Sequence, residues 1–118
     1  MQALKLSTAD RDGHVIVTVK GEINVLTQRS LDVYLSDVCQ TGSQVVVDLS
    51  GLTFLDASGL GVLLRFWKEL NRDGGSLTLA GARYGSARIL WTTGLDKRLS
   101  LTTDIDQAIA LTASRSAE

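Results

Sequence analysis

One serine stands where this sequence could carry regulated chemistry. Ser58 follows Asp56 and Ala57 and precedes Gly59 and Gly61, at the point where an apolar segment gives way to a helical pattern. A serine at the N-cap of a helix faces free backbone N–H groups, which attract anions, and neighbouring glycines leave room for one. We therefore place Ser58 at the N-cap and predict that this helix start tolerates a phosphate on its hydroxyl.

Acidic residues would surround such a phosphate. Asp56 lies two residues before Ser58, and Glu22 ends another strand-like segment whose loop is expected to open on the same edge. A phosphate carries nearly two negative charges, so its addition would change this surface strongly. The local sequence taken alone still favours an ordinary capping role for Ser58, and dipole stabilisation explains Asp56 as well as a role in recognition does.

Other chemistries find little support in the residue inventory. The chain has one cysteine, Cys39, and one histidine, His14, which excludes an intramolecular disulfide and a Cys/His zinc site within one chain. Neither residue is patterned as a base or nucleophile beside Ser58, which argues against a hydrolase. The G-x-G fragment after Ser58 lacks the rest of a nucleotide-binding motif, and Asp48 is predicted to cap the following turn. We expect no metal, no cofactor and no enzymatic activity.

Length and charge set the class of protein. The chain has 118 residues, with 12 Lys plus Arg against 13 Asp plus Glu, a formal net charge of −1 and 44% apolar residues. This composition predicts one domain over residues 1–118 with a tail that frays from about residue 113. The charge balance argues against nucleic acid as a partner. The absence of a signal-peptide pattern and of a long apolar run predicts no membrane span and a cytoplasmic location.

Alternating strand and helix patterns must position the serine. Two β-rich runs around an Asp-Gly turn predict a hairpin over residues 4–8 and 14–20, and later strands are predicted over residues 44–49, 76–81 and 99–102. Residues 50–57 are expected to form a loop. About four helices are predicted, over residues 24–39, 59–72, 84–93 and 104–113, the first capped by Asn24 or Thr27. The order predicts an α/β fold with a central mixed sheet.

The helix after Ser58 is predicted to bury one stripe. At 100° per residue, that stripe comprises Leu60, Leu63, Leu64, Trp67, Leu70 and Asn71. Val62 and Phe66 fall outside it, on the shoulder that holds Ser58. Apolar side chains beside a modifiable hydroxyl predict an exposed docking surface that a phosphate switches off.

Four segments carry a resemblance to a known family. They are Gly21-Glu22-Ile23-Asn24, QVVVDLSGLTFLDASGLGVLL, GGSLTLAG and Thr93-Gly94-Leu95. In this order they resemble the STAS domain of bacterial anti-sigma factor antagonists, from about Leu4 to about Leu111. The resemblance implies the STAS fold and a protein that switches partners.

The resemblance also implies a mechanism for Ser58. Such a protein binds an anti-sigma factor, often one that is also a serine kinase; phosphorylation at the position of Ser58 blocks binding, and a serine phosphatase restores it. The surface expected to bind the partner comprises Glu22, Asn24, Asp56, Gly59, Val62 and Phe66. The chain has Asn24 where the family commonly has Asp, and Ala57 where it frequently has Ser or Thr. The alternative is a docking subunit that does not switch, in a lipid-transport or stressosome-like assembly; the oligomeric state is not predicted.

Overall fold

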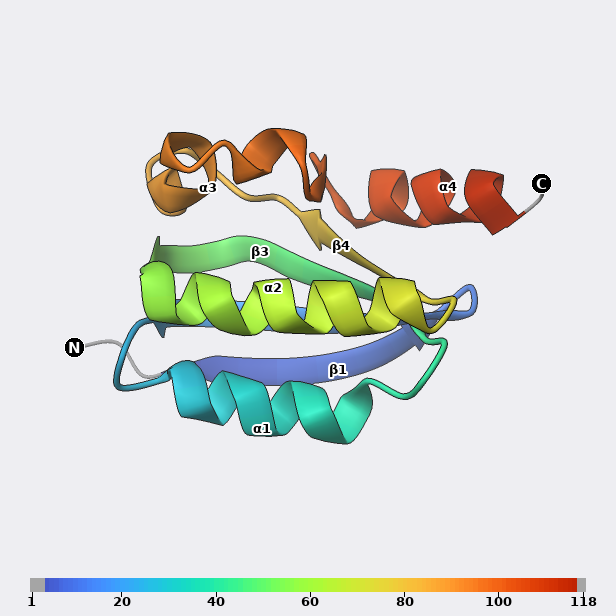
Figure 1. Cartoon of the computed structure of the whole chain (residues 1–118), viewed down its shortest axis with the longest axis horizontal. Helices are drawn as coiled ribbons and strands as arrows, with labels where there is room; N and C mark the ends of the chain where they lie inside the picture. The colour runs from blue at the N-terminus through green and yellow to red at the C-terminus, as the bar shows by residue number, and fades with distance from the viewer. Residues whose placement is uncertain (1–3, 117–118) are drawn as a thin grey trace.

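A mixed five-stranded sheet forms the centre of the molecule (Figure 1). The structure is a computed structural model that describes residues 4–116, with side chains as far as Thr112. Within this range the strands lie side by side in chain order: β1 Lys5–Arg11, β2 His14–Ile23, β3 Gln44–Leu55, β4 Ser76–Ala80 and β5 Ser100–Thr102. β1 pairs antiparallel with β2, and the remaining pairs are parallel. The predicted α/β fold with an N-terminal hairpin is confirmed.

The hairpin turn is the one that its sequence requires. Asp12 and Gly13 both have positive φ, at 52° and 79°. A two-residue turn of this kind matches the twist of the flanking strands, and Asp-Gly is among the pairs that adopt it readily. Both strands run about three residues further than predicted, to Arg11 and Ile23.

Helices cover both faces of the sheet. Their bounds are α1 Gln28–Val38, α2 Ala57–Arg72, α3 Arg88–Thr92 and α4 Ile105–Ser116, with a short 3-10 turn at Leu95–Lys97. α1 and α2 lie together in front of the sheet in Figure 1. Val45 and Val47 of β3 face their apolar core, whereas Val46 belongs to a second cluster with Ala108 of α4. Because successive strand residues point to opposite faces, β3 is buried on both sides.

The expected loop over residues 50–57 is wrong, because β3 continues as a strand to Leu55. The end of β2 runs alongside and pairs Glu22 with Phe54 and Ile23 with Leu55, which supplies the hydrogen bonds that a loop would lack. The register shifts between Asp48 and Gly51. There the Asp48 carboxylate accepts a hydrogen bond from the Ser50 backbone N–H at 3.0 Å. Asp48 thus makes a local capping contact, but the turn that it was predicted to cap is part of β3.

α2 buries a wider surface than predicted. Leu60, Leu63 and Leu70 are buried as expected, but Val62 and Phe66 are also buried, with 6% and 5% exposure. Leu64 and Trp67 are half-buried, and Asn71 is exposed. The predicted exposed shoulder is therefore wrong. The physical reason is that α1 and α3 also contact α2, so more than its sheet-facing stripe is covered.

Other helix bounds also differ from the prediction. Residues 24–27 form a turn before α1, and residues 84–86 form a turn before the short α3. Gly94, with φ of 76°, follows α3 in the left-handed conformation that commonly ends a helix. α4 extends to Ser116, three residues beyond its predicted end, and residues 117–118 lie outside the described residues. The fraying predicted from about residue 113 stays a prediction.

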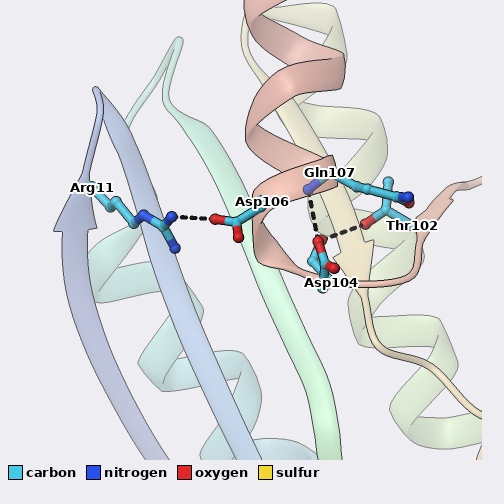
Figure 2. Close-up of polar contacts among 5 residues, drawn as sticks. All are labelled: Arg11, Thr102, Asp104, Asp106 and Gln107. Atoms are coloured by element: carbon cyan, nitrogen blue, oxygen red, sulfur yellow. Dashed lines mark hydrogen bonds and ion pairs between the residues drawn. The ribbon is translucent and has the colours of Figure 1, made fainter.

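Side chains fix the start of α4, as Figure 2 shows. Asp104 accepts a hydrogen bond from the Gln107 backbone N–H at 2.8 Å, which caps the helix. The Thr102 hydroxyl lies 3.2 Å from the Asp104 backbone oxygen. Asp106 forms an ion pair with Arg11, which ties the end of β1 to the first turn of α4. The start of α4 thus contacts both edge strands of the sheet, β1 through Asp106 and β5 through Asp104.

Candidate functional site

The predicted site residues Glu22, Asn24, Asp56 and Ser58 come together at one edge of the sheet. Parallel strands end at the same edge, and β2 and β3 end in register with Ile23 opposite Leu55. The Asp56 backbone N–H donates to the Ile23 carbonyl oxygen at 3.1 Å, directly after both strands. The expectation that the Glu22 loop and the Ser58 helix share an edge is confirmed.

Asp56, not Ser58, is the N-cap of α2. Asp56 has extended backbone angles, and its carboxylate accepts a hydrogen bond from the Gly59 backbone N–H. α2 begins at Ala57, which places Ser58 at the second position of its first turn. Aspartate caps a helix as well as serine does, so the residue nearer the strand end takes the position. The prediction of Ser58 as N-cap is wrong, although Ser58 remains at the helix start.

The Ser58 hydroxyl is partly exposed and bound to the capping carboxylate. Ser58 Oγ donates a hydrogen bond to Asp56 Oδ1 at 2.6 Å, and the same oxygen accepts from the Gly59 N–H at 3.0 Å. The other oxygen, Asp56 Oδ2, accepts from the Val25 backbone N–H at 3.1 Å. A single carboxylate therefore contacts the serine, the helix start and the loop after β2.

These donors stabilise the charged form of Asp56. Desolvation raises the pKa of Asp56, but the hydrogen bonds from the Ser58 hydroxyl and from the backbone N–H groups of Gly59, Ser58 and Val25 outweigh it. The net result is a pKa below the ordinary value. Asp56 is thus an anion at neutral pH and a weak base toward its serine neighbour.

Asn24 shapes the loop that follows β2. Its Oδ1 accepts from the backbone N–H groups of Leu26 at 2.9 Å and Thr27 at 3.1 Å, an Asx-type turn. Its Nδ2 donates to Glu22 Oε2 in a long hydrogen bond of 3.5 Å. The acceptor role would suit aspartate equally, but the donor role would not, because an aspartate here would face the Glu22 carboxylate. Thr27, the other predicted cap, occupies the N-cap position of α1 but makes no side-chain cap hydrogen bond there.

Gly59 has a packing role. A Cβ added at this position would lie 2.3 Å from Ile23 Cγ2 and 2.9 Å from Leu55 Cδ1, distances that real side chains do not adopt. Gly59 therefore lets α2 approach the ends of β2 and β3 closely. Gly59, Val62 and Phe66 are buried in the structure, so these expected contact residues lie beneath the edge rather than on it.

Exposed apolar side chains at this edge escaped the sequence analysis. Val25 is 69% exposed, Leu26 is 75% exposed and Phe54 is 48% exposed. Phe54 also lines an open groove of about 460 Å³ between the start of α2 and α3, where Arg88 supplies a cation. The signal was present as an apolar pair directly after Asn24, but it was absorbed into a predicted helix over residues 24–39. We call Glu22, Asn24, Val25, Leu26, Phe54, Asp56 and Ser58 together the serine edge.

The other chemistry-bearing residues lie away from the serine edge. His14 is buried at the opposite end of β2, roughly 30 Å away at strand spacing, and its ring nitrogens bind the Asp12 carbonyl oxygen and the Thr112 hydroxyl. It cannot act as a base for Ser58, and its predicted structural role is confirmed.

Burial raises the pKa of the Cys39 thiol to about 11. In the part of the chain that the structure describes, no cluster of ligands suits a metal ion and no helix could span a membrane.

The fold and the edge define a STAS domain, and the sequence agrees. Residues 5–108 match the STAS domain family, so the chain belongs to that family. The resemblance noted from four segments is thereby confirmed.

The relatives carry names from sigma-factor regulation. An "Anti-sigma-B factor antagonist" of Staphylococcus aureus is 30% identical over 93 residues, which is 78% of this chain and 86% of that protein. The crystal structure of an anti-sigma factor antagonist from Mycobacterium paratuberculosis is 31% identical with a TM-score of 0.82, covering 96% of this chain and 95% of that one. The anti-sigma factor antagonist SpoIIAA in its unphosphorylated form shares the fold, at 20% identity, a TM-score of 0.73, and coverage of 95% of this chain and 97% of that one.

Proposed function

We propose that this protein is an anti-sigma factor antagonist that binds an anti-sigma factor through the serine edge and is switched off by phosphorylation of Ser58. The names of its relatives support the role. The observation that carries the proposal is a partly exposed serine hydroxyl at a helix start, on the same sheet edge as exposed apolar side chains. We also propose a cytoplasmic location, because the proposed partner acts on the transcription apparatus.

The unmodified edge fits a partner surface with apolar and cationic groups. Val25, Leu26 and Phe54 offer apolar area, and the carboxylates of Glu22 and Asp56 complement Arg or Lys on the partner. Gly59, Val62 and Phe66 support this surface from beneath by fixing the position of α2. We therefore assign direct contact to the loop after β2 and the end of β3.

Phosphorylation would add charge at the centre of this surface. A serine kinase transfers the terminal phosphoryl group of a nucleoside triphosphate to Ser58 Oγ; the new P–O bond replaces the bond to the nucleoside diphosphate, and the hydroxyl proton passes to the kinase or to solvent. The backbone N–H groups of the first turn favour the phosphate, whereas the neighbouring Asp56 repels it. A serine phosphatase reverses the change by transferring the group to water.

The magnitude is sufficient for partner exchange. A doubly charged group that the interface must desolvate costs about 2 to 5 kcal/mol of binding free energy. A loss of about 2 kcal/mol already weakens the dissociation constant by about 30-fold.

Calorimetric titration tests the switch. The titrant is a purified anti-sigma factor from the same organism, and the variants are Ser58→Ala, Ser58→Asp and, as a control, Ser36→Asp on the exposed side of α1. We expect wild type, Ser58→Ala and the control to bind alike, and Ser58→Asp to bind at least about 30-fold more weakly. Incubation of the wild-type protein with the anti-sigma factor and ATP should add one phosphate at Ser58, and mass spectrometry identifies the modified residue.

Two results would count against the switch. Equal affinity of Ser58→Asp and wild type would refute it and would favour the alternative, a docking subunit in a lipid-transport or stressosome-like assembly. Phosphate addition at a residue other than Ser58 would refute the assignment of the phosphoacceptor.

A further inference from the structure

We propose that Asp56 couples the chemical state of Ser58 to the order of the Val25–Leu26 loop, so that a phosphate on Ser58 loosens the docking loop as well as adding charge. This inference rests on the proposed function and concerns the regulation of the same site. Asp56 acts in it as a positioning residue.

The two oxygens of one carboxylate make the connection. Asp56 Oδ1 accepts from the Ser58 hydroxyl and from the Gly59 N–H, whereas Asp56 Oδ2 accepts from the Val25 N–H. Val25 and Asp56 are 31 residues apart in sequence, so this contact joins the loop after β2 to the start of α2. Any rotation of the Asp56 side chain that breaks one contact disturbs the others.

Apart from the backbone hydrogen bond from the Asp56 N–H to the Ile23 carbonyl oxygen, the remaining loop contacts are local. The N–H groups of Leu26 and Thr27 donate to Asn24 Oδ1, and the Thr27 hydroxyl donates to the Glu22 carbonyl oxygen at 2.8 Å. These contacts stay within residues 22–27 and do not involve α2. Loss of the Asp56 contact should therefore free the Val25 amide while it leaves the turn made by Asn24 in place.

A phosphate on Ser58 would act on Asp56 in three ways. It removes the hydroxyl donor that binds Oδ1, it places like charge beside the carboxylate, and it competes for the Gly59 N–H at the helix start. The donors that now hold the pKa of Asp56 below its ordinary value would thus be partly lost. Each change weakens the orientation in which Oδ2 accepts from Val25.

Amide hydrogen exchange of individual residues, measured by NMR, tests the coupling without a partner protein. In Ser58→Asp we expect the Val25 amide to exchange about tenfold faster than in wild type, with Leu26 and Thr27 within about twofold. Ser58→Ala, which removes the donor without adding charge, should give a smaller rise. Ser36→Asp should leave Val25 unchanged. An unprotected Val25 amide in wild type, or an equal rate in Ser58→Asp, would overturn the inference.

A double-mutant cycle separates coupling from a merely structural effect. Asn is as good an N-cap as Asp, so Asp56→Asn should fold and keep α2, but it should raise the Val25 exchange rate by itself. Adding Ser58→Asp should then produce no further rise, because the coupling group is already absent. In the matched control, Asp37→Asn at an exposed position of α1, Ser58→Asp should raise the rate as it does in wild type. Additive effects of Ser58→Asp and Asp56→Asn would refute the coupling.

The tests of the two proposals fail independently. Weakened partner binding with an unchanged Val25 rate overturns the coupling and leaves the switch intact. A faster Val25 rate with unweakened partner binding supports the coupling and overturns the switch.

Discussion

Replacement of Gly59 by alanine should expose how tightly α2 is seated on the strand ends. The added Cβ would lie 2.3 Å from Ile23 Cγ2 and 2.9 Å from Leu55 Cδ1. Ile23 and Leu55 are 0% and 2% exposed, so neither side chain has space into which it can move. α2 must shift away from β2 and β3, or the two side chains must adopt strained rotamers.

The expected cost follows from two opposing terms. Overpacking of a filled core costs about 1 to 3 kcal/mol, and a clash this short belongs at the upper end. Alanine in place of glycine within a helix returns up to about 1 kcal/mol. We therefore expect Gly59→Ala to lower the free energy of unfolding by about 2 kcal/mol.

Gly61 provides the matched control, because it lies two residues later in the same helix. A Cβ at Gly61 would meet nothing within 4 Å, so Gly61→Ala should raise the stability by about 0.5 to 1 kcal/mol. Urea denaturation followed by circular dichroism measures both variants. If Gly59→Ala proves as stable as Gly61→Ala, the close approach of α2 to β2 is wrong, and with it the position assigned to Ser58.

Three further predictions address charge, reactivity and docking. Because the pKa of Asp56 is lowered in the folded state, the Asp56 anion stabilises the fold above the ordinary aspartate pKa, and this stabilisation is lost as pH falls through the folded pKa. Between pH 7 and about pH 3, the urea midpoint should therefore fall less in Asp56→Asn than in wild type. With its pKa raised from 9.0 to about 11, the Cys39 thiol should react with iodoacetamide at pH 8 about 100-fold more slowly than in the urea-unfolded chain. Leu26→Ala should weaken binding of the anti-sigma factor at least about fivefold with unchanged stability, whereas Val33→Ala, at an exposed apolar residue of α1, should leave the affinity unchanged. An equal loss of affinity in both variants would remove the loop from the docking surface.

The order of strands and helices was predictable because local patterns and tertiary structure agree. The Asp-Gly pair at residues 12–13 and the apolar run over residues 44–49 each point to one structure, and the sheet contains both. The end of β3 was not predictable in the same way. Ser50 and Gly51 favour a turn locally, yet pairing with β2 extends the strand to Leu55.

The site was predictable in position but not in detail. Asp56 and Ser58 both suit an N-cap by composition, and a single sequence does not show which of them the strand ends hold in place. The Val25 N–H, from a segment 31 residues earlier, reaches the Asp56 carboxylate and fixes that choice. Val62 and Phe66 illustrate the same limit, because helical periodicity shows where apolar residues lie and not how many neighbours cover them.

The loop after β2 gives the strongest physical reason to treat the serine edge as a binding surface. Val25 and Leu26 are 69% and 75% exposed, so the hydrophobic effect does little to order them. Contacts to Asn24 and Asp56 nevertheless hold their backbone N–H groups. Ordering an exposed apolar loop carries an entropic cost without gain in burial within the monomer. That cost is offset when a partner covers the loop, because a preordered surface loses less conformational entropy on binding.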